Sequence, residues 1–388
     1  MWKQPWSLKE GFFIGLGLIA VGAALQLATG PVAWQVFAWP VNLVMLGLIV
    51  ALLAAAYVCH DKVYAVRYLM SWRSAVAALA YAVPLTIIMG VTRQVPGNAE
   101  PTDALGLSRM LSFWPFVLVY LWVALTVGLV GIRQWTHLSW RRLPAAASHL
   151  GLFIVLVSGT LGSADMQRVK MYCEKGQPEW RVIDENNRTV ELPLAIQLNR
   201  FILEEYPPKF IVVDNQTGQT LMHGGRPLTL TADSTLTRGR LGGWTITVLE
   251  RRADDVLKVR ATDTHTGQAV GEGIVACGNY MMPPQMVALG QRYSLAIPAR
   301  EPRRYASEVE VMTKSGKHLE ATIEVNKPLT VEGWKIYQYS YNTEMGRWSS
   351  YSVLELVTDP WLPVVYVGIA LLAVGAIGMF FKKRREED

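Results

Sequence analysis

Cysteine and charge are both scarce in this sequence. Only 3 of its 388 residues are cysteine, and 18% are charged, whereas globular domains carry about 25% charged residues. Cys59, Cys173 and Cys277 do not form a Cys-x-x-Cys or Cys-x-x-Cys-His motif. These absences exclude a disulfide-rich scaffold, a zinc ribbon and a covalent c-type haem site. Hydrophobic residues make up 51% of the chain and its mean hydropathy is +0.21, which indicates a membrane protein with a soluble part.

Long uncharged runs give the membrane spans. A bilayer core needs about 20 mostly apolar residues per helix, and we predict six such helices. They are Gly11 to Gly30, Ala38 to Val58, Ala75 to Val91, Phe113 to Ile132, Ala145 to Ala164 and Trp361 to Phe381. The first run lacks a small-x-small cleavage site followed by a polar segment. We therefore expect it to be a retained membrane helix.

Basic residues predict the orientation of these spans, because Lys and Arg favour cytoplasmic ends. If the spans alternate, 12 of the 37 basic residues fall on one side. These are Lys3, Lys9, Lys62, Arg67, Arg73, Arg133, Arg141, Arg142, Lys382, Lys383, Arg384 and Arg385. We expect both termini to be cytoplasmic and residues 165–360 to lie outside the cytoplasm. The net charge of +6 then reflects orientation, and no nucleic acid partner is expected.

The segment between the fifth and sixth spans has short alternating patterns. Trp244, Ile246 and Val248 share one face of a predicted strand, and turn residues such as Gly242-Gly243 separate the strands. This pattern predicts an all-β antiparallel sandwich or barrel-like domain. The predicted organisation is transmembrane helices one to five in residues 1–164, the β-rich domain in 165–360, the sixth helix in 361–381 and a basic tail in 382–388.

His149 is the first candidate site residue. It lies about five residues inside the fifth span, roughly 7 Å from the cytoplasmic end, where an ionisable side chain usually faces the bundle interior and has a partner. It is hydrogen-bonded to a backbone carbonyl, or simply interfacial, or an axial ligand of haem iron. A stripe of mostly small residues on this span predicts close packing against another helix or a flat ligand. The stripe comprises Ser148, Gly151, Val155, Ser158 and Gly162.

His60 is the second candidate. It lies at the cytoplasmic end of the second span beside Asp61 and Lys62, and is either interfacial or the second ligand of a bis-histidine haem site. The other histidines lie in a polar loop or near turns, so we expect no site at His137, His223, His265 or His318.

Cys173 and Cys277 both lie in the external segment, where an oxidising compartment permits a disulfide. The alternatives are inert thiols, or thiols that exchange with a client cysteine pair. Cys59 is most simply a buried free thiol.

Residues 326–342 read Asn-Lys-Pro-Leu-Thr-Val-Glu-Gly-Trp-Lys-Ile-Tyr-Gln-Tyr-Ser-Tyr-Asn. This run resembles the signature of the ResB/CcsB family of cytochrome c biogenesis proteins, a strand pair reading N-x-P-L-x-x-x-G-[WY]-x-[IF]-Y-Q. Residues 148–152 resemble the membrane H-x-G-L element of the family, residues 192–207 its first external strands, and residues 356–368 its D-P passage into the last span. The resemblance extends from about Ser148 to Gly368.

The resemblance implies a subunit of the ResB–CcsA (System II) machinery in the bacterial cytoplasmic membrane, with the β domain in the periplasm. Such a subunit aids delivery of haem and its attachment to CxxCH motifs of apocytochrome c, and does not complete the reaction alone. The family's functional transmembrane histidine matches His149. The implied cofactor is haem b in transit, with His60 as a further candidate ligand. The implied partners are a CcsA/ResC-type membrane protein, apocytochrome c, a thiol–disulfide reductant and the bilayer.

Two departures from the family pattern are visible. The family usually has four spans, so we interpret the third and fourth spans here as an extra pair or a lineage variant. The W-W-D segment of the CcsA partner is absent, since no two tryptophans are adjacent. Two other functions stay open: a membrane subunit that holds a permanent b-type haem in an oxidoreductase, and a non-catalytic assembly scaffold.

Overall fold

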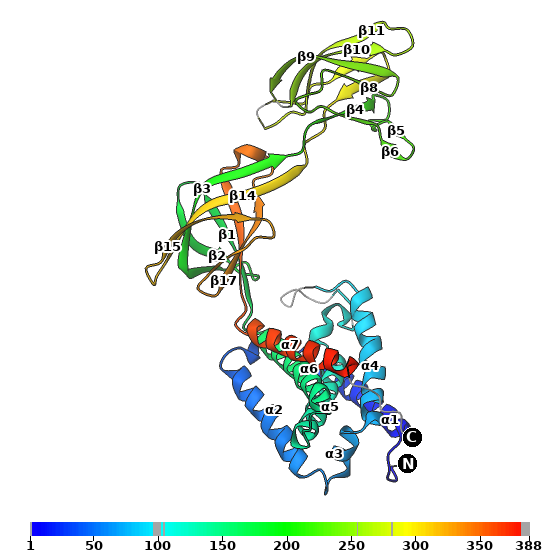
Figure 1. The fold of residues 1–388 in the computed structure, drawn as a ribbon, viewed down its shortest axis with the longest axis vertical. Coiled ribbons are helices and arrows are strands. Elements are labelled where there is room, and N and C mark those ends of the chain that lie inside the picture. The colour runs from blue at the N-terminus through cyan, green and yellow to red at the C-terminus, as the bar shows by residue number, and fades with distance from the viewer. Residues whose placement is uncertain (1, 96–101, 104, 254, 281, 382–388) are drawn as a thin grey trace. The chain divides into compact units, whose positions relative to one another are not determined.

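The computed structural model describes residues 2–95, 102–103, 105–253, 255–280 and 282–381 (Figure 1). The chain divides into two compact units, Met1–Gln167 with Thr358–Asp388, and Arg168–Val357. We name them the helical unit and the β unit and describe each by itself. The predicted basic tail with Lys382, Lys383, Arg384 and Arg385 lies outside the described residues.

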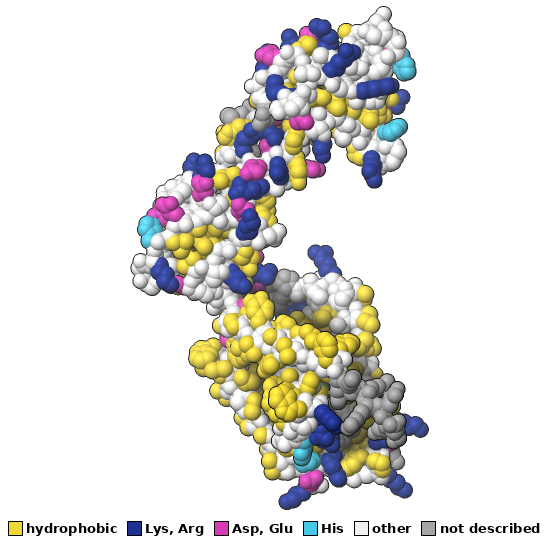
Figure 2. Space-filling model, in the orientation of Figure 1, with side chains coloured by type: hydrophobic (Ala, Val, Ile, Leu, Met, Phe, Trp, Pro, Cys, Tyr) yellow, Lys and Arg dark blue, Asp and Glu magenta, His cyan; other side chains and the backbone are white. Residues whose placement is uncertain are grey.

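The helical unit has, within its described residues, six helices long and apolar enough to cross a membrane, which confirms the predicted spans. They are α1 (Leu8–Thr29), α2 (Val41–Val58), α4 (Trp72–Val91), α5 (Trp114–Thr136), α6 (Leu143–Gly162) and α7 (Leu362–Phe380). The connections contain α3 (Tyr64–Leu69) and the 3-10 helices η1 (Trp34–Phe37) and η2 (Leu107–Ser112). Apolar side chains cover much of this unit's surface in Figure 2, as expected of a surface in contact with lipid.

Local sequence signals start these helices. Ser7 caps α1 in a capping box with Glu10. α5, α6 and α7 each carry proline in the first turn, at Pro115, Pro144 and Pro363. Proline suits this position because its fixed φ matches the helix and its missing N–H would have no intrahelical partner.

α5 is the most buried of the six helices and contacts α1, α2, α4 and α6. Buried polar contacts connect it to its neighbours: the Trp122 indole donates to Ser74 of α4, and the Tyr120 hydroxyl donates to the Leu156 carbonyl of α6. The helices alternate in direction, so α1, α4 and α6 begin, and α2, α5 and α7 end, at one end of the bundle. We name it the basic end, because its loops hold Lys62, Arg67, Arg141 and Arg142.

The β unit contains an eight-stranded sheet in the order β15-β14-β3-β2-β1-β18-β17-β16. Contacts of β15 with β16 and β17 bring the two edges of the sheet together, so that it is nearly a barrel. We name this part the barrel lobe; its core includes Met171, Ile196, Val311 and Ile336. Its elements are β1 (Gln167–Glu174), β2 (Pro178–Ile183), β3 (Thr189–Glu205), β14 (Pro302–Thr313), β15 (His318–Glu324), β16 (Leu329–Val331), β17 (Trp334–Tyr341), η3 (Gly346–Trp348) and β18 (Tyr351–Thr358).

Residues 206–301 form a second lobe, inserted between the paired strands β3 and β14 (Figure 1). We name it the sandwich lobe, because the sheets β11-β10-β9-β8 and β12-β13-β4-β7 share one core with Phe210, Ile246, Leu257 and Leu295. Its strands are β4 (Lys209–Asp214), β5 (Met222–His223), β6 (Arg226–Pro227), β7 (Thr229–Thr231), β8 (Arg238–Leu241), β9 (Trp244–Ala253), β10 (Val256–Asp263), β11 (Ala269–Ala276), β12 (Val287–Leu289) and β13 (Tyr293–Ala296). The predicted β-rich insertion between the fifth and sixth membrane helices is confirmed; its two separate cores were not predicted.

The run at residues 326–342 forms the β16–β17 hairpin. Val331 pairs with Trp334, so Glu332 and Gly333 make a two-residue turn. Both have positive φ, +48° and +85°, as a type I′ hairpin turn requires. On β17, Gln338 is buried and its amide hydrogen-bonds Ser307 and Ser352 at 2.6 and 2.8 Å. This hairpin therefore stabilises the barrel lobe.

Candidate functional site

His149 lies in the second turn of α6 and is half-buried. Its Nδ1 donates a hydrogen bond of 2.9 Å to the backbone carbonyl of Ala145; a carbonyl oxygen only accepts, so Nδ1 carries the proton. In the neutral ring, Nε2 then holds the lone pair, and it has no hydrogen-bond partner among the described residues. A second hydrogen bond that fixes the tautomer is the usual arrangement of a metal-binding imidazole. The ring can therefore both bond the backbone and ligate a metal.

The two faces of α6 have different roles. The small-residue stripe packs against α7: a Cβ on Gly151 would lie 2.5 Å from the Gly368 carbonyl oxygen, and a Cβ on Gly375 would lie 2.5 Å from the Ser148 nitrogen. The sequence left two partners open for this stripe, another helix or a flat ligand. In the structure the partner is the helix α7. His149 lies on another face, which it shares with Phe153 at i+4.

His60 follows the end of α2 at the basic end. Its Nδ1 donates to the Tyr57 carbonyl at 2.5 Å, and its ring stacks on that of Tyr57 with centroids 5.0 Å apart. Its Nε2 lies 3.4 Å from a carboxylate oxygen of the exposed Asp61. The carboxylate occupies space beside this nitrogen that a metal would need, so the surroundings of His60 suit ligation less well than those of His149.

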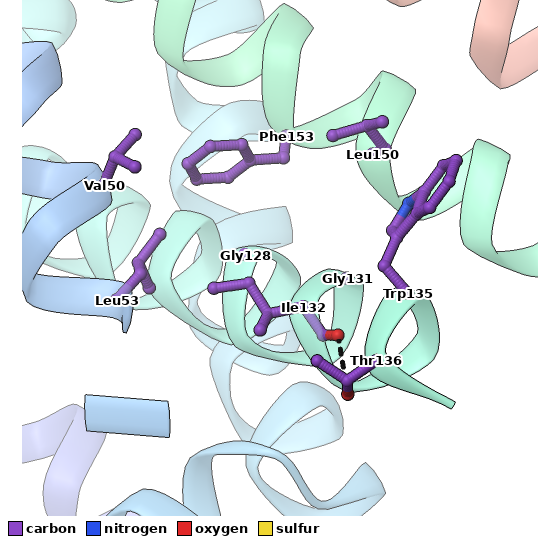
Figure 3. Close-up of a pocket in the computed structure, with 9 residues that line it drawn as sticks. All are labelled: Val50, Leu53, Gly128, Gly131, Ile132, Trp135, Thr136, Leu150 and Phe153. Atoms are coloured by element: carbon purple, nitrogen blue, oxygen red, sulfur yellow. Dashed lines mark hydrogen bonds between the residues drawn. The ribbon is translucent and has the colours of Figure 1, made fainter. Parts of the chain in front are cut away.

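An apolar pocket of about 530 Å³ lies between α2, α5 and α6 (Figure 3), within the range of about 300–1,000 Å³ common for small-molecule sites. His149 directly precedes the lining residue Leu150. The ring of His60 reaches the pocket indirectly, because Tyr57 is hydrogen-bonded to the lining residue Thr136 at 2.6 Å. Neither histidine lines the pocket: His149 is next to a lining residue in the chain, whereas Tyr57 separates His60 from the pocket. No contact joins the two histidines in the described part of the chain.

The remaining histidines are all exposed: His137, His223, His265 and His318. The imidazole of His318 is hydrogen-bonded to Glu310 on the surface of the barrel lobe. Within the described ranges, no group of three or more His, Cys, Asp and Glu could hold a metal ion. A single imidazole suffices as an axial ligand of haem, because the porphyrin supplies the other nitrogens.

Asp165 connects three helix ends at the end of the bundle opposite the basic end. Its carboxylate accepts from the Trp39 backbone N–H at 2.7 Å, the Asn42 side-chain amide at 2.7 Å and the Trp361 indole at 2.8 Å. Burial opposes the charged form, but these three donors outweigh it and hold the pKa of Asp165 below its ordinary value. Sequence reasoning missed this residue, although an aspartate directly after a predicted span was a visible signal.

Cys173 and Cys277 are both free thiols. Cys173 belongs to the barrel core and Cys277 packs against the sandwich core, so the disulfide considered from the sequence is not formed. Burial raises the pKa of Cys173 to about 12. Burial, with a hydrogen bond to Asp255, raises that of Cys277 to about 11. Both thiols are therefore protonated and unreactive at neutral pH. Cys59, expected to be buried, is exposed, because it follows the last turn of α2.

A model of the ResB-like family matches residues 290–350. This segment runs from the turn before β13 to the start of β18 and contains the β16–β17 hairpin. The chain carries a ResB-like segment. The predicted resemblance to the ResB/CcsB family is thereby confirmed over this segment. His149 and His60 lie outside the matched residues, so their roles stay predictions.

No curated protein matches this chain. The solved structure "Cytochrome c Heme Lyase CcmF" is similar over 97% of this chain at 11% sequence identity, with a TM-score of 0.28. The chain spans 46% of the length of that protein. A TM-score of this size does not establish a common fold.

Proposed function

We propose that this chain is a ResB-like subunit of a cytochrome c synthase complex, which aids delivery of haem and its attachment to CxxCH motifs of apocytochrome c. The ResB-like match at residues 290–350 supports the biological role. The observation that carries the site is the geometry of His149: its Nδ1 is fixed by the Ala145 carbonyl, and its Nε2 has no partner in the described residues.

In this proposal haem b is cargo in transit. His149 supplies one axial imidazole, and a CcsA/ResC-type partner supplies the other. The apolar pocket between α2, α5 and α6 accommodates the apolar part of the ligand and keeps water from it. His60 serves as the second ligand only if its ring turns away from Asp61. This chain's residues bind and orient, while haem brings the reactive vinyl groups.

The proposed location is the bacterial cytoplasmic membrane, with both termini cytoplasmic and the β unit in the periplasm. The basic end of the bundle supports this orientation through the positive-inside rule. The β unit positions apocytochrome c so that its two thiols meet the vinyl groups, which lowers the barrier by proximity. Thioether formation needs reduced client thiols. Since Cys173 and Cys277 are protonated, we assign the reduction of the client thiols to a separate thiol–disulfide reductant.

The test is purification from cells that coexpress a CcsA-type partner and a CxxCH reporter, followed by an optical spectrum and a holocytochrome assay. We expect a Soret band and reporter haem, and loss of both in His149→Ala. The matched control is His137→Ala, which changes an exposed histidine near the same end of the bundle. A preparation without haem under all these conditions contradicts the proposal.

The same experiment separates the two other functions. Loss of a stable Soret band in both His149→Ala and His60→Ala, without the partner, indicates a permanent b-type haem held within one chain. The position of both histidines near the basic end of the bundle favours this as the second candidate. Holocytochrome formation that is unchanged in His149→Ala indicates an assembly scaffold in which the histidine only packs.

A further inference from the structure

A second pocket, of about 780 Å³, lies at the end of the helical unit opposite the basic end. Trp39, Leu43 and Leu46 line one side, and Trp361 and Val364 line the other. Trp39 is 67% exposed and Val364 is 45% exposed, so the groove opens outward. The outward surface of α2 and α7 is the lipid-facing surface of a membrane bundle, and tryptophan at helix ends marks the depth of lipid headgroups.

The polar end of this groove carries an uncompensated negative charge. Within the described ranges, the hydrogen bonds to Asp165 come from neutral donors, namely Trp39, Asn42 and Trp361. Among the described residues it forms no ion pair with lysine, arginine or histidine. One of its oxygens, Oδ1, accepts a single hydrogen bond, whereas a carboxylate oxygen can accept two. The site therefore has both the charge and the free lone pair to bind a cation.

Two further polar side chains line the groove beside Asp165. They are Gln167 and Thr358, and neither side chain has a hydrogen-bond partner in the described part of the molecule. An amide N–H and a hydroxyl can both donate to phosphoryl oxygens. The groove thus offers one anionic acceptor and two neutral donors above an apolar channel, which is the complement of a zwitterionic headgroup on an acyl chain.

We propose that this groove binds one bilayer phospholipid whose headgroup carries a primary ammonium. The ammonium pairs with Asp165, the phosphate accepts from Gln167 and Thr358, and an acyl chain lies along Trp39, Leu43 and Leu46. An anionic lipid is disfavoured because, among the residues that the structure describes, no basic side chain lines the groove to offset Asp165. Haem is disfavoured as well, since its propionates are anionic and the described lining contains no histidine, cysteine or methionine. The proposal is independent of the function proposed for His149.

The test uses the full chain in nanodiscs or detergent with defined lipids. Native mass spectrometry counts phosphatidylethanolamine and phosphatidylglycerol retained from an equal mixture. We expect one retained phosphatidylethanolamine and about a tenfold preference over phosphatidylglycerol, which corresponds to about 1.4 kcal/mol. Equal retention of the two lipids overturns the proposal.

Two variants locate the binding. Leu46→Trp fills the channel while leaving the hydrogen bonds of Asp165 intact, and we expect it to lose the retained lipid. Its matched control is Leu48→Trp, at an exposed position of the same helix that does not line the groove; it should retain the lipid as the parent does. Asp165→Asn removes the charge and should abolish the headgroup preference. Retention unchanged in Leu46→Trp, or lost equally in Leu48→Trp, contradicts the assigned site.

Discussion

The indole of Trp361 donates a 2.8 Å hydrogen bond to the carboxylate of Asp165, although the two residues are 196 positions apart in the sequence. Asp165 follows the end of α6 and Trp361 precedes the start of α7. This hydrogen bond therefore joins the two connecting segments that lead to and from the β unit. Asn42 at the start of α2 is fully buried, and its side-chain amide donates to the same carboxylate. Three helix ends therefore depend on one acceptor.

Replacing Asp165 by alanine should destabilise the helical unit. The change leaves the Trp361 indole and one Asn42 contact without an acceptor, and a buried donor without a partner costs about 1–3 kcal/mol. Thermal unfolding of the full chain in detergent, followed by tryptophan fluorescence, measures the effect. Trp361→Phe removes only one of the three donors and should cost less than Asp165→Ala. An unchanged transition in Asp165→Ala would show that the three helix ends are held by packing alone.

The contribution of Asp165 should depend on pH at the acid side. Its pKa in the folded chain lies below the ordinary 3.8, so the stabilisation is fully present above about pH 4 and is lost as pH falls through the folded-state pKa. Other carboxylates titrate in the same acidic pH range. One is Glu324, whose pKa is lowered to about 2 by Arg304 and Lys327. The informative measurement is therefore the difference in stability between the parent and Asp165→Ala. This difference should shrink as pH falls below 4; a difference independent of pH contradicts the assignment.

Gly151 should tolerate no side chain. A Cβ there would lie 2.4 Å from the Leu372 nitrogen and 2.5 Å from the Gly368 oxygen, and both are backbone atoms of α7. Overpacking of this kind costs about 1–3 kcal/mol, so Gly151→Ala should lower the unfolding temperature in detergent. Gly159 lies on the same helix with no atom within 4 Å of an added Cβ. Gly159→Ala should therefore be neutral or slightly stabilising, and equal destabilisation by the two changes would refute close α6–α7 packing.

Gln338 should be a structural residue of the barrel lobe. Gln338→Ala removes the partner of Ser307 and Ser352 and leaves a cavity in the core, with an expected cost of about 2–4 kcal/mol. Chemical unfolding of the full chain, followed by circular dichroism in the β region, reports the loss. Gln177→Ala, at an exposed position of the same lobe, should change little. Haem content should stay proportional to folded protein in both variants, since a separate loss of haem would assign Gln338 a role in binding.

The six spans were predictable because a helix in lipid must satisfy its backbone hydrogen bonds internally and must present apolar side chains over the thickness of the bilayer. Both requirements produce a long apolar run in the sequence. The β16–β17 hairpin was predictable from Glu332-Gly333 between apolar strands. The division of the β unit was not predicted. Pro207 and Pro208 mark an interruption after β3, but such an interruption does not distinguish a turn within one core from the start of a second core. The candidate histidines were visible as polar residues at helix ends, whereas the Asp165 contacts were not. They join residues 39, 42, 165 and 361, and no local pattern encodes such a separation.

Thiol labelling should distinguish the three cysteines. At pH 8, a thiol with a pKa of about 11 has about 100-fold less thiolate than one with a pKa of 9, and only the thiolate reacts. We expect one fast-reacting site in the native protein, at the exposed Cys59, and two further sites only after unfolding without reductant. Mass spectrometry of protein treated with N-ethylmaleimide counts them. Cys59→Ser should abolish the fast phase, and fewer than three labels after unfolding would indicate a disulfide.

The rate of thiol labelling at Cys277 should depend on the charge of Asp255. The Cys277 thiol donates to the Asp255 carboxylate at 3.3 Å, which stabilises the protonated form and, after burial, is the next cause of the raised pKa. Asp255→Asn removes the negative charge next to the sulfur, so the thiolate costs less and labelling at pH 8 should be several-fold faster. Cys173 has no carboxylate hydrogen-bond acceptor in the described part of the chain, and burial is the main cause of its raised pKa. Its labelling rate in the same variant is therefore the internal control. Equal acceleration of both thiols would mean that Asp255→Asn loosens the β unit as a whole.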